Sequence, residues 1–168
     1  MGQDSTTLIR PVLLDNTVLT NFALVGRDDL VLHLWPGTVC TTPAVRQEYD
    51  AGAARGVPAG AWTDLSAVAL SAEEAAFAAR LPPRLGAGER ECLAVAVRRD
   101  GLLASDDRDA RDAAHDHGVP TTGTLGILVA CVRRGFVSRA QADALLAEMI
   151  DWGYRSPLGN LGPLLDEP

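Results

Sequence analysis

The chain has 168 residues, of which 47% are hydrophobic, and its 22 acidic residues against 15 basic ones give a net charge of −7. The hydrophobic fraction fits a folded globular domain and excludes a disordered chain, and no apolar run approaches the roughly 20 residues that span a bilayer. An acidic chain gains little from diffuse attraction to a polyanion, so binding one would need a local reversal of charge, such as a bound divalent cation supplies.

The N-terminal residues and the cysteines indicate where the protein resides. Residues 1–10 lack the basic-then-apolar pattern of a secretory signal. The three cysteines, Cys40, Cys92 and Cys131, have neither a disulfide framework nor zinc-ligand spacing. We therefore expect a cytoplasmic protein with buried, reduced thiols.

Short apolar runs alternate with amphipathic stretches along the chain, which is typical of a parallel α/β fold. In the first half, the pattern predicts strands at residues 11–15 and 38–41 and a third within 62–70. Helices are expected at residues 17–25, 28–35, 42–55 and 71–81. The second of these strands leads into Thr42-Pro43, a helix start with proline in the first turn, and Ser71 begins a capping box.

The same alternation continues through the second half of the chain. It predicts strands at residues 101–105 and 119–121. Helices are expected at residues 89–99, 107–117, 124–134 and 139–152. We divide the chain into an N-terminal extension at residues 1–10, one domain at 11–155, and a Gly/Pro-rich C-terminal tail at 156–168.

Acidic residues follow two of the predicted strands directly. Asp15 ends the first strand, and Asp106 and Asp107 follow the fourth. Ligands of open α/β sheets bind outside the carboxyl ends of the strands, so these side chains meet there if the two strands are neighbours. The alternative is that each aspartate only caps the helix that follows it.

Three glutamates on predicted helices are candidates for the same edge of the sheet. Glu48 lies on the helix after the second strand, where a solvated residue is the plain alternative. Glu89 and Glu91 lie in a first helical turn, where the helix dipole favours acids in any case. Residues at i and i+2 do not share a helix face, so we expect only one of these two to point into a site.

A cluster of carboxylates is costly because the charges repel one another and raise the pKa of some members. A divalent cation removes that cost, and an all-oxygen ligand set suits magnesium or manganese rather than zinc or copper. Such a cation lowers the pKa of a bound water and orients a phosphodiester. The pattern therefore points to metal-dependent phosphodiester hydrolysis.

Five segments together resemble PIN domains, and in particular relatives of the VapC-type ribonucleases with GE-x-E, DD-x-x-AR and G-T-x-G segments. The segments are LLDNTVLTNF (13–22), TPAVRQEY (42–49), LGAGERECLAVA (85–96), ASDDRDAR (104–111) and GVPTTGTLGILVACVRRGFVS (118–138). The resemblance extends over residues 11–155. It implies a three-layer α/β/α fold with a short parallel sheet of strand order 3-2-1-4-5, and an endoribonuclease that hydrolyses RNA with Mg²⁺ or Mn²⁺.

The resemblance also implies roles for individual residues. The catalytic acids are Asp15, Glu48, Glu91 and Asp107. Glu89 and Asp106 are further metal-ligand candidates, with Glu91 preferred to Glu89 and Asp107 to Asp106.

Four more residues are expected around the acids. Asn16 and Thr17 would orient Asp15, and Arg111 would pair with Asp107 or meet a substrate phosphate. Thr124 would receive a phosphate at a helix start or simply form a turn and cap.

Other readings stay open at this point. A ribonuclease of this kind is in some cases the toxin of a toxin–antitoxin pair with a small protein antitoxin. The alternative is a catalytically silent PIN-fold module that binds nucleic acid or a partner. A phospho-accepting receiver is disfavoured because the chain has no lysine.

A homodimer is also considered, with a surface formed by Leu125, Ile127, Leu128 and Val132. We interpret Trp35, Trp62 and Trp152 as core or interface anchors rather than base-stacking platforms.

Overall fold

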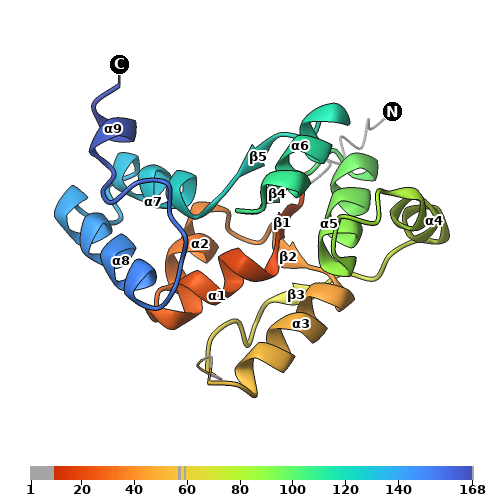
Figure 1. The fold of residues 1–168 in the computed structure, drawn as a ribbon, viewed down its shortest axis with the longest axis horizontal. Helices are drawn as coiled ribbons and strands as arrows, with labels where there is room; N and C mark the ends of the chain where they lie inside the picture. The colour runs from red at the N-terminus through yellow and green to blue at the C-terminus, as the bar shows by residue number, and fades with distance from the viewer. Residues whose placement is uncertain (1–9, 57, 59, 168) are drawn as a thin grey trace, which may run out of the picture.

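The computed structural model describes residues 10–56, 58 and 60–167, and a sheet of five parallel strands in the order β3-β2-β1-β4-β5 lies at its centre (Figure 1). The strands are β1 (Val12–Leu14), β2 (Val39–Thr41), β3 (Ser66–Ala67), β4 (Leu102–Ala104) and β5 (Thr121–Thr122). The predicted α/β class and strand order are confirmed. Apart from Arg10, the predicted N-terminal extension at residues 1–10 lies outside the described residues.

Strand β1 is the middle strand, paired on one side with β2 and on the other with β4. All three of its residues are buried, and Leu13 and Leu14 are fully so. A strand that is covered on both faces has a continuous apolar run instead of an alternating one, as this sequence does. Asp15 therefore emerges from the centre of the sheet at its carboxyl edge.

Helices cover both faces of the sheet. They are α1 (Asn16–Leu24), α2 (Asp28–Leu34), α3 (Pro43–Ala53), α4 (Ala72–Arg80), α5 (Ala87–Arg98), α6 (Arg108–Asp116), α7 (Thr124–Arg133), α8 (Arg139–Asp151) and α9 (Gly162–Leu165). Helices α1, α2, α7 and α8 gather on one side of the strands and α4 and α5 on the other (Figure 1). Within the described residues, no helix combines the length and apolarity needed to cross a membrane.

Two helix starts follow the predicted caps, and one differs. The Thr42 side chain accepts from the N–H of Val45, and Ser71 forms a capping box. Helix α5 begins at Ala87, two residues before the predicted start at Glu89. The cause is a carboxylate cap, because Glu89 Oε2 accepts from the N–H of Gly86 at 2.8 Å.

Strand β5 and the C-terminal segment also differ from the prediction. Strand β5 pairs through Thr121 and Thr122 rather than residues 119–121, because the N–H of Val119 still bonds to Ala114 at the end of α6. The predicted tail at 156–168 contains helix α9 and the buried Leu161. The N–H of Leu161 donates to Asp143 at 2.7 Å, which fixes this segment against α8.

Buried side chains settle several expectations about surfaces. Ile127 and Leu128 are fully buried core residues, so the dimer surface predicted on α7 is wrong in this respect, and Leu125 and Val132 pack against the same core. Trp62 is a core anchor, 1% exposed, whose Nε1 donates to Leu19.

The sequence also predicts environments for the cysteines and for Trp35 and Trp152. Trp35 is partly buried and packs against the core. Cys40, Cys92 and Cys131 are buried free thiols, as expected, and burial raises the pKa of each. Trp152 is not a core residue, since 61% of it is exposed.

Candidate functional site

Asp15 lies at the carboxyl end of β1, beside the end of β4. Its N–H donates to Ala104 at 2.9 Å, and its carboxylate accepts from the N–H of Asn16 at 2.7 Å and from the hydroxyl of Ser105 at 2.8 Å. The residue is 3% exposed. The pKa of Asp15 is raised to about 6, chiefly by burial and to a smaller extent by the negative charges of Glu48 and Asp107, against the lowering effect of the two hydrogen bonds.

Asp107 caps α6 and keeps one oxygen available. Its Oδ1 accepts from the N–H of Ala110 at 2.8 Å, and its own N–H donates to the Ser105 hydroxyl at 3.2 Å. Within the described part of the chain, Oδ2 of Asp107 accepts no hydrogen bond. The predicted capping role and an available acceptor are thus combined in one residue.

Asp106, next in the chain, has a different environment, because both of its oxygens are occupied. Oδ1 accepts from the N–H of Thr124 at 2.8 Å and from Tyr154 Oη at 3.4 Å. Oδ2 accepts from Thr124 Oγ1 at 2.6 Å and from Asn21 Nδ2 at 3.3 Å. Asp106 therefore joins α1, α7 and the segment after α8. This geometry does not support its predicted role as a metal ligand.

Glu48 and Glu89 approach each other at the first turn of α5. Glu48 Oε1 accepts from the N–H of Gly88 at 3.1 Å, and Glu89 Oε2 from the N–H of Gly86 at 2.8 Å. Burial raises the pKa of Glu89, and the charges of Asp15, Asp107 and Glu48 raise it further. Among the described residues, the second carboxylate oxygen of each glutamate accepts no hydrogen bond.

Glu91 points to another place. Its Oε2 accepts from the N–H of Ala44 at 2.9 Å, in the first turn of α3. Residues two apart in a helix lie on different faces, and it is Glu89 that faces Asp15 and Asp107. The preference for Glu91 over Glu89 as the third acid is therefore not supported by the structure.

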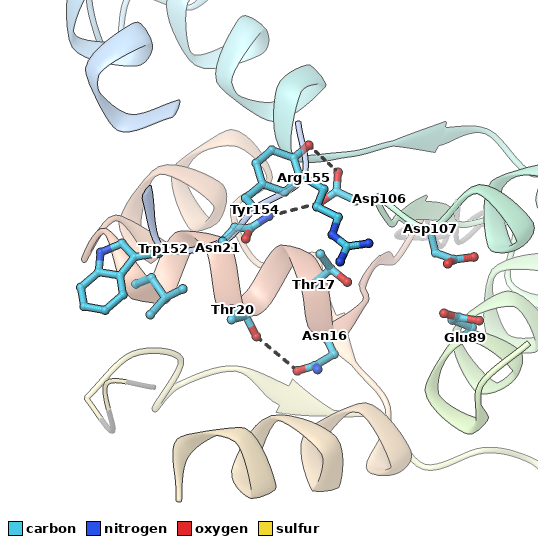
Figure 2. A pocket seen from close by; sticks show the side chains of 12 residues that line it. Asn16, Thr17, Thr20, Asn21, Glu89, Asp106, Asp107, Trp152, Tyr154 and Arg155 are labelled. Atoms are coloured by element: carbon cyan, nitrogen blue, oxygen red, sulfur yellow. Dashed lines mark hydrogen bonds between the residues drawn. The ribbon is translucent and has the colours of Figure 1, made fainter. Parts of the chain in front are cut away.

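An open cleft of about 460 Å³, here called the acidic cleft, lies at this edge of the sheet (Figure 2). It is lined by Asn16, Thr17, Thr20, Asn21, Leu24, Glu89, Asp106, Asp107, Trp152, Gly153, Tyr154 and Arg155. Figure 2 shows Glu89 and Asp107 at one end of the cleft and Trp152 at the other. Asp15 is buried and does not line it.

The residues expected around the acids are placed as follows. Asn16 contacts Asp15 through its backbone N–H, while its side chain accepts from Thr20 at 3.5 Å. Thr17 is exposed and lines the cleft. Arg111 Nη1 donates to the backbone oxygen of Ser105 at 3.1 Å, and within the described residues it makes no ion pair with Asp107, contrary to one of its two predicted roles. Thr124 binds Asp106, as described above.

Sequence reasoning missed three residues that hold the site together. Ser105, Asn21 and Tyr154 bond to Asp15 or Asp106. A signal existed for two of them: Ser105 directly precedes the Asp106–Asp107 pair, and Asn21 is a polar residue on the otherwise apolar buried face of α1. Nothing in the sequence around Tyr154 indicated its contact.

The side chains, as they stand, do not form a ready metal site. Within the described residues, no three His, Cys, Asp or Glu side chains are close enough together to hold an ion. The donor set nevertheless has the chemistry of a hard-cation site: Glu48, Glu89 and Asp107 each have a carboxylate oxygen without a hydrogen bond, and Asp15 is buried beside them. A cation among them would offset their repulsion. The residues fit Mg²⁺ or Mn²⁺ in charge and ligand type.

Comparison with known proteins adds one finding. A family model described as a PIN domain matches residues 11–165, which is nearly the whole chain. No curated protein and no solved structure matches it.

Proposed function

Because this chain belongs to the PIN-domain family, whose members are generally nucleases, we propose that it is a divalent-metal-dependent endoribonuclease that hydrolyses RNA phosphodiester bonds. Nuclease chemistry is the coarse statement that the family supports. The metal dependence and the choice of RNA rest on the residues of the site.

One observation carries the proposal: four carboxylates from four separate segments lie at the carboxyl edge of β1 and β4, near enough for their charges to raise the pKa values of Asp15 and Glu89, although no three of them are close enough to hold an ion as they stand. Asp15 follows β1, Asp107 follows β4, and Glu48 and Glu89 meet at the first turn of α5. A protein that only needed helix caps would not require four acids that repel one another in one place. A site for a hard cation gives such a group of oxygen ligands a role.

The proposed roles follow from which oxygens are available. Asp15, Glu48, Glu89 and Asp107 would hold Mg²⁺ or Mn²⁺, with Glu89 replacing Glu91 in the predicted set. Ser105 positions Asp15 by donating from its hydroxyl, and Asp106 fixes the wall of the cleft. When bound, the cation supplies positive charge for the substrate phosphate and lowers the pKa of a coordinated water.

The test is cleavage of fluorescently labelled RNAs of varied sequence by the purified protein. We expect cleavage with magnesium or manganese and none in excess EDTA. Asp107→Asn should lose at least about 100-fold of the rate, since one acid of the metal site is removed while asparagine still caps α6. The matched control is Asp112→Asn, the same change at an exposed position of α6.

Two outcomes would contradict the proposal. Cleavage that persists in EDTA would show that the activity does not depend on a divalent metal. Complete failure to cut across the RNA set, with RNA binding retained, would instead favour the catalytically silent binding module.

A finer form of the proposal is that the protein is the toxin of a toxin–antitoxin pair. Its support is the resemblance of residues 85–96, 104–111 and 118–138 to VapC-type relatives. The partner would be a small antitoxin protein that covers the acidic cleft.

A further inference from the structure

The segment that follows α8 forms one wall of the acidic cleft. Trp152, Gly153, Tyr154 and Arg155 all line it. The wall is anchored at Tyr154, whose N–H donates to Met149 at 2.9 Å and whose hydroxyl donates to Asp106 at 3.4 Å. Its flanking side chains, Trp152 and Arg155, are exposed.

Trp152 presents a large apolar side chain to solvent inside this cleft. It is 61% exposed, and Phe136, at 41%, is the other large hydrophobic residue exposed among the described residues. Scattered exposed apolar residues need no explanation by themselves. Trp152 differs in that it shares a hollow with three carboxylates and a guanidinium.

Arg155 is the cation of that hollow. Within the part of the chain that the structure describes, its guanidinium makes neither a hydrogen bond nor an ion pair. Figure 2 shows the side chain reaching from Tyr154 across the cleft toward Thr17 and Asp107. It also lines a second hollow of about 420 Å³ that adjoins the first at Asp106 and Tyr154. A free guanidinium fork matches the geometry of a phosphate group.

We propose that Trp152 and Arg155 form a subsite for unpaired RNA, in which a base stacks on the indole ring while the guanidinium binds a backbone phosphate. The inference rests on the proposed function, and it adds the two side chains that would recognise an unpaired nucleotide. A base has a free face for stacking on a side chain only when it is outside a duplex. Because Trp152 lies at the opposite end of the cleft from Glu89 and Asp107, it would hold a nucleotide that flanks the one being cut.

Binding rather than cleavage tests this subsite. The probe is a short, fluorescently labelled single-stranded RNA, and the blunt duplex of the same sequence is the comparison. Each RNA is titrated with the full chain in buffer that contains calcium ions, and binding is followed by the fluorescence anisotropy of the label. Trp152→Ala should weaken single-strand binding by about 5- to 100-fold and leave duplex binding nearly unchanged. Trp152→Phe should retain most of the affinity, and Phe136→Ala all of it.

Arg155 is tested in the same titrations at several salt concentrations. Arg155→Ala should weaken binding. It should also make the plot of log affinity against log salt less steep, by the amount that corresponds to about one lost phosphate contact. Arg155→Lys should restore the slope and only part of the affinity, because an ammonium group lacks the guanidinium fork.

The melting temperature of each variant should match the wild type, since both side chains are exposed. Unchanged single-strand affinity in Trp152→Ala, or an equal loss for single strand and duplex, would overturn the proposal. The outcome is separable from the proposed function. If the protein cuts RNA but binds single strands equally well without Trp152, the nuclease proposal stands and the subsite proposal is wrong. If single-strand binding needs Trp152 but the protein never cuts RNA, the subsite proposal stands and the nuclease proposal is wrong.

Discussion

The hydroxyl of Ser105 bridges two acids of the site: it donates to Oδ2 of Asp15 at 2.8 Å and accepts the N–H of Asp107 at 3.2 Å. Ser105 is fully buried, so neither bond competes with water. One side chain thus fixes the ends of β1 and β4 relative to each other. The stability, selectivity and rate of the proposed site should all depend on such contacts.

The first prediction concerns Asp15 and pH. Its pKa in the folded protein is raised to about 6 from 3.8, so the carboxylate destabilises the folded state above pH 6, and the penalty disappears as the pH falls through 6 toward 4. In EDTA at pH 8, Asp15→Asn should therefore be more stable than the wild type by about 1–3 kcal/mol. The Ser105 hydroxyl, which donates to Oδ2, can rotate to accept from the new amide, whereas the backbone N–H and the amide group that donate to Asp106 cannot. Urea unfolding at pH 8 and pH 4 measures the difference.

At pH 4 the gain of Asp15→Asn should be largely gone, and in manganese at pH 8 the order should reverse, since only the wild type gains binding energy. Asp112→Asn provides the control for a charge change outside the site. An Asp15→Asn advantage that is the same at both pH values would show that burial of the charge is not its cause.

The second prediction separates the two glutamates of α5. Glu89→Gln should lower the rate of RNA cleavage by at least about 100-fold, because it removes a charge that faces Asp15 and Asp107. Glu91→Gln should stay within a few-fold of the wild type. Glutamine retains an oxygen that can accept from Gly86 or Ala44, so both variants should fold. The reverse ranking would return Glu91 to the site.

The third prediction separates the neighbouring aspartates. Asp106→Asn should lower the free energy of unfolding by about 1–3 kcal/mol, because an amide nitrogen cannot accept from the donors that surround this carboxylate. Asp107→Asn should change stability little, since asparagine is an equally good helix cap, but should lower the cleavage rate by at least about 100-fold. Chemical denaturation and a cleavage assay of both proteins test the distinction. Equal stability of the two would argue that the Asp106 network contributes nothing.

These residues also show how far the sequence could lead. The apolar run at residues 11–15 and the alternation of strands and helices predicted a parallel α/β sheet, and the resemblance to PIN domains implied its strand order. The acids at strand ends predicted the carboxyl edge of the sheet as the site. Those features depend on local patterns and on the general behaviour of parallel sheets.

The choices within acidic pairs could not be made from the sequence. Glu89 and Glu91 differ in which face of α5 they occupy, and the first turn of α5 began two residues earlier than its pattern indicated. Asp106 and Asp107 differ in their long-range partners, Thr124 and Tyr154 against Ala110. Side-chain partners that are distant in the chain leave no periodic signal.

The fourth prediction tests the approach of α3 to α5. A Cβ atom on Gly88 would lie 2.7 Å from Val45 Cγ2 and 3.0 Å from Glu48 Oε2. Gly88→Ala should therefore push α3 outward, lower the free energy of unfolding by about 1–3 kcal/mol, and slow cleavage by displacing Glu48. Gly86→Ala is the matched control, because its nearest neighbour would be 3.8 Å away. Wild-type activity of Gly88→Ala would show that the position of Glu48 is not required.

The fifth prediction concerns the toxin role. Induced expression of the wild type in a bacterial host should slow growth, and Asp15→Ala should relieve the effect at an equal level of soluble protein. Growth curves with matched immunoblots provide the measurement. A wild type that is harmless while active on RNA in vitro would keep the nuclease and remove the toxin role.

The buried thiols have a practical consequence for such experiments. Cys40, Cys92 and Cys131 are enclosed by the core, and burial raises the pKa of each, so alkylating reagents should leave them untouched in the folded protein. The natural chain can therefore serve as a background for bioconjugation without replacing its own cysteines. A single cysteine introduced on an exposed helix such as α6 would carry a dye or spin label, and the movement of RNA along the cleft could be followed directly.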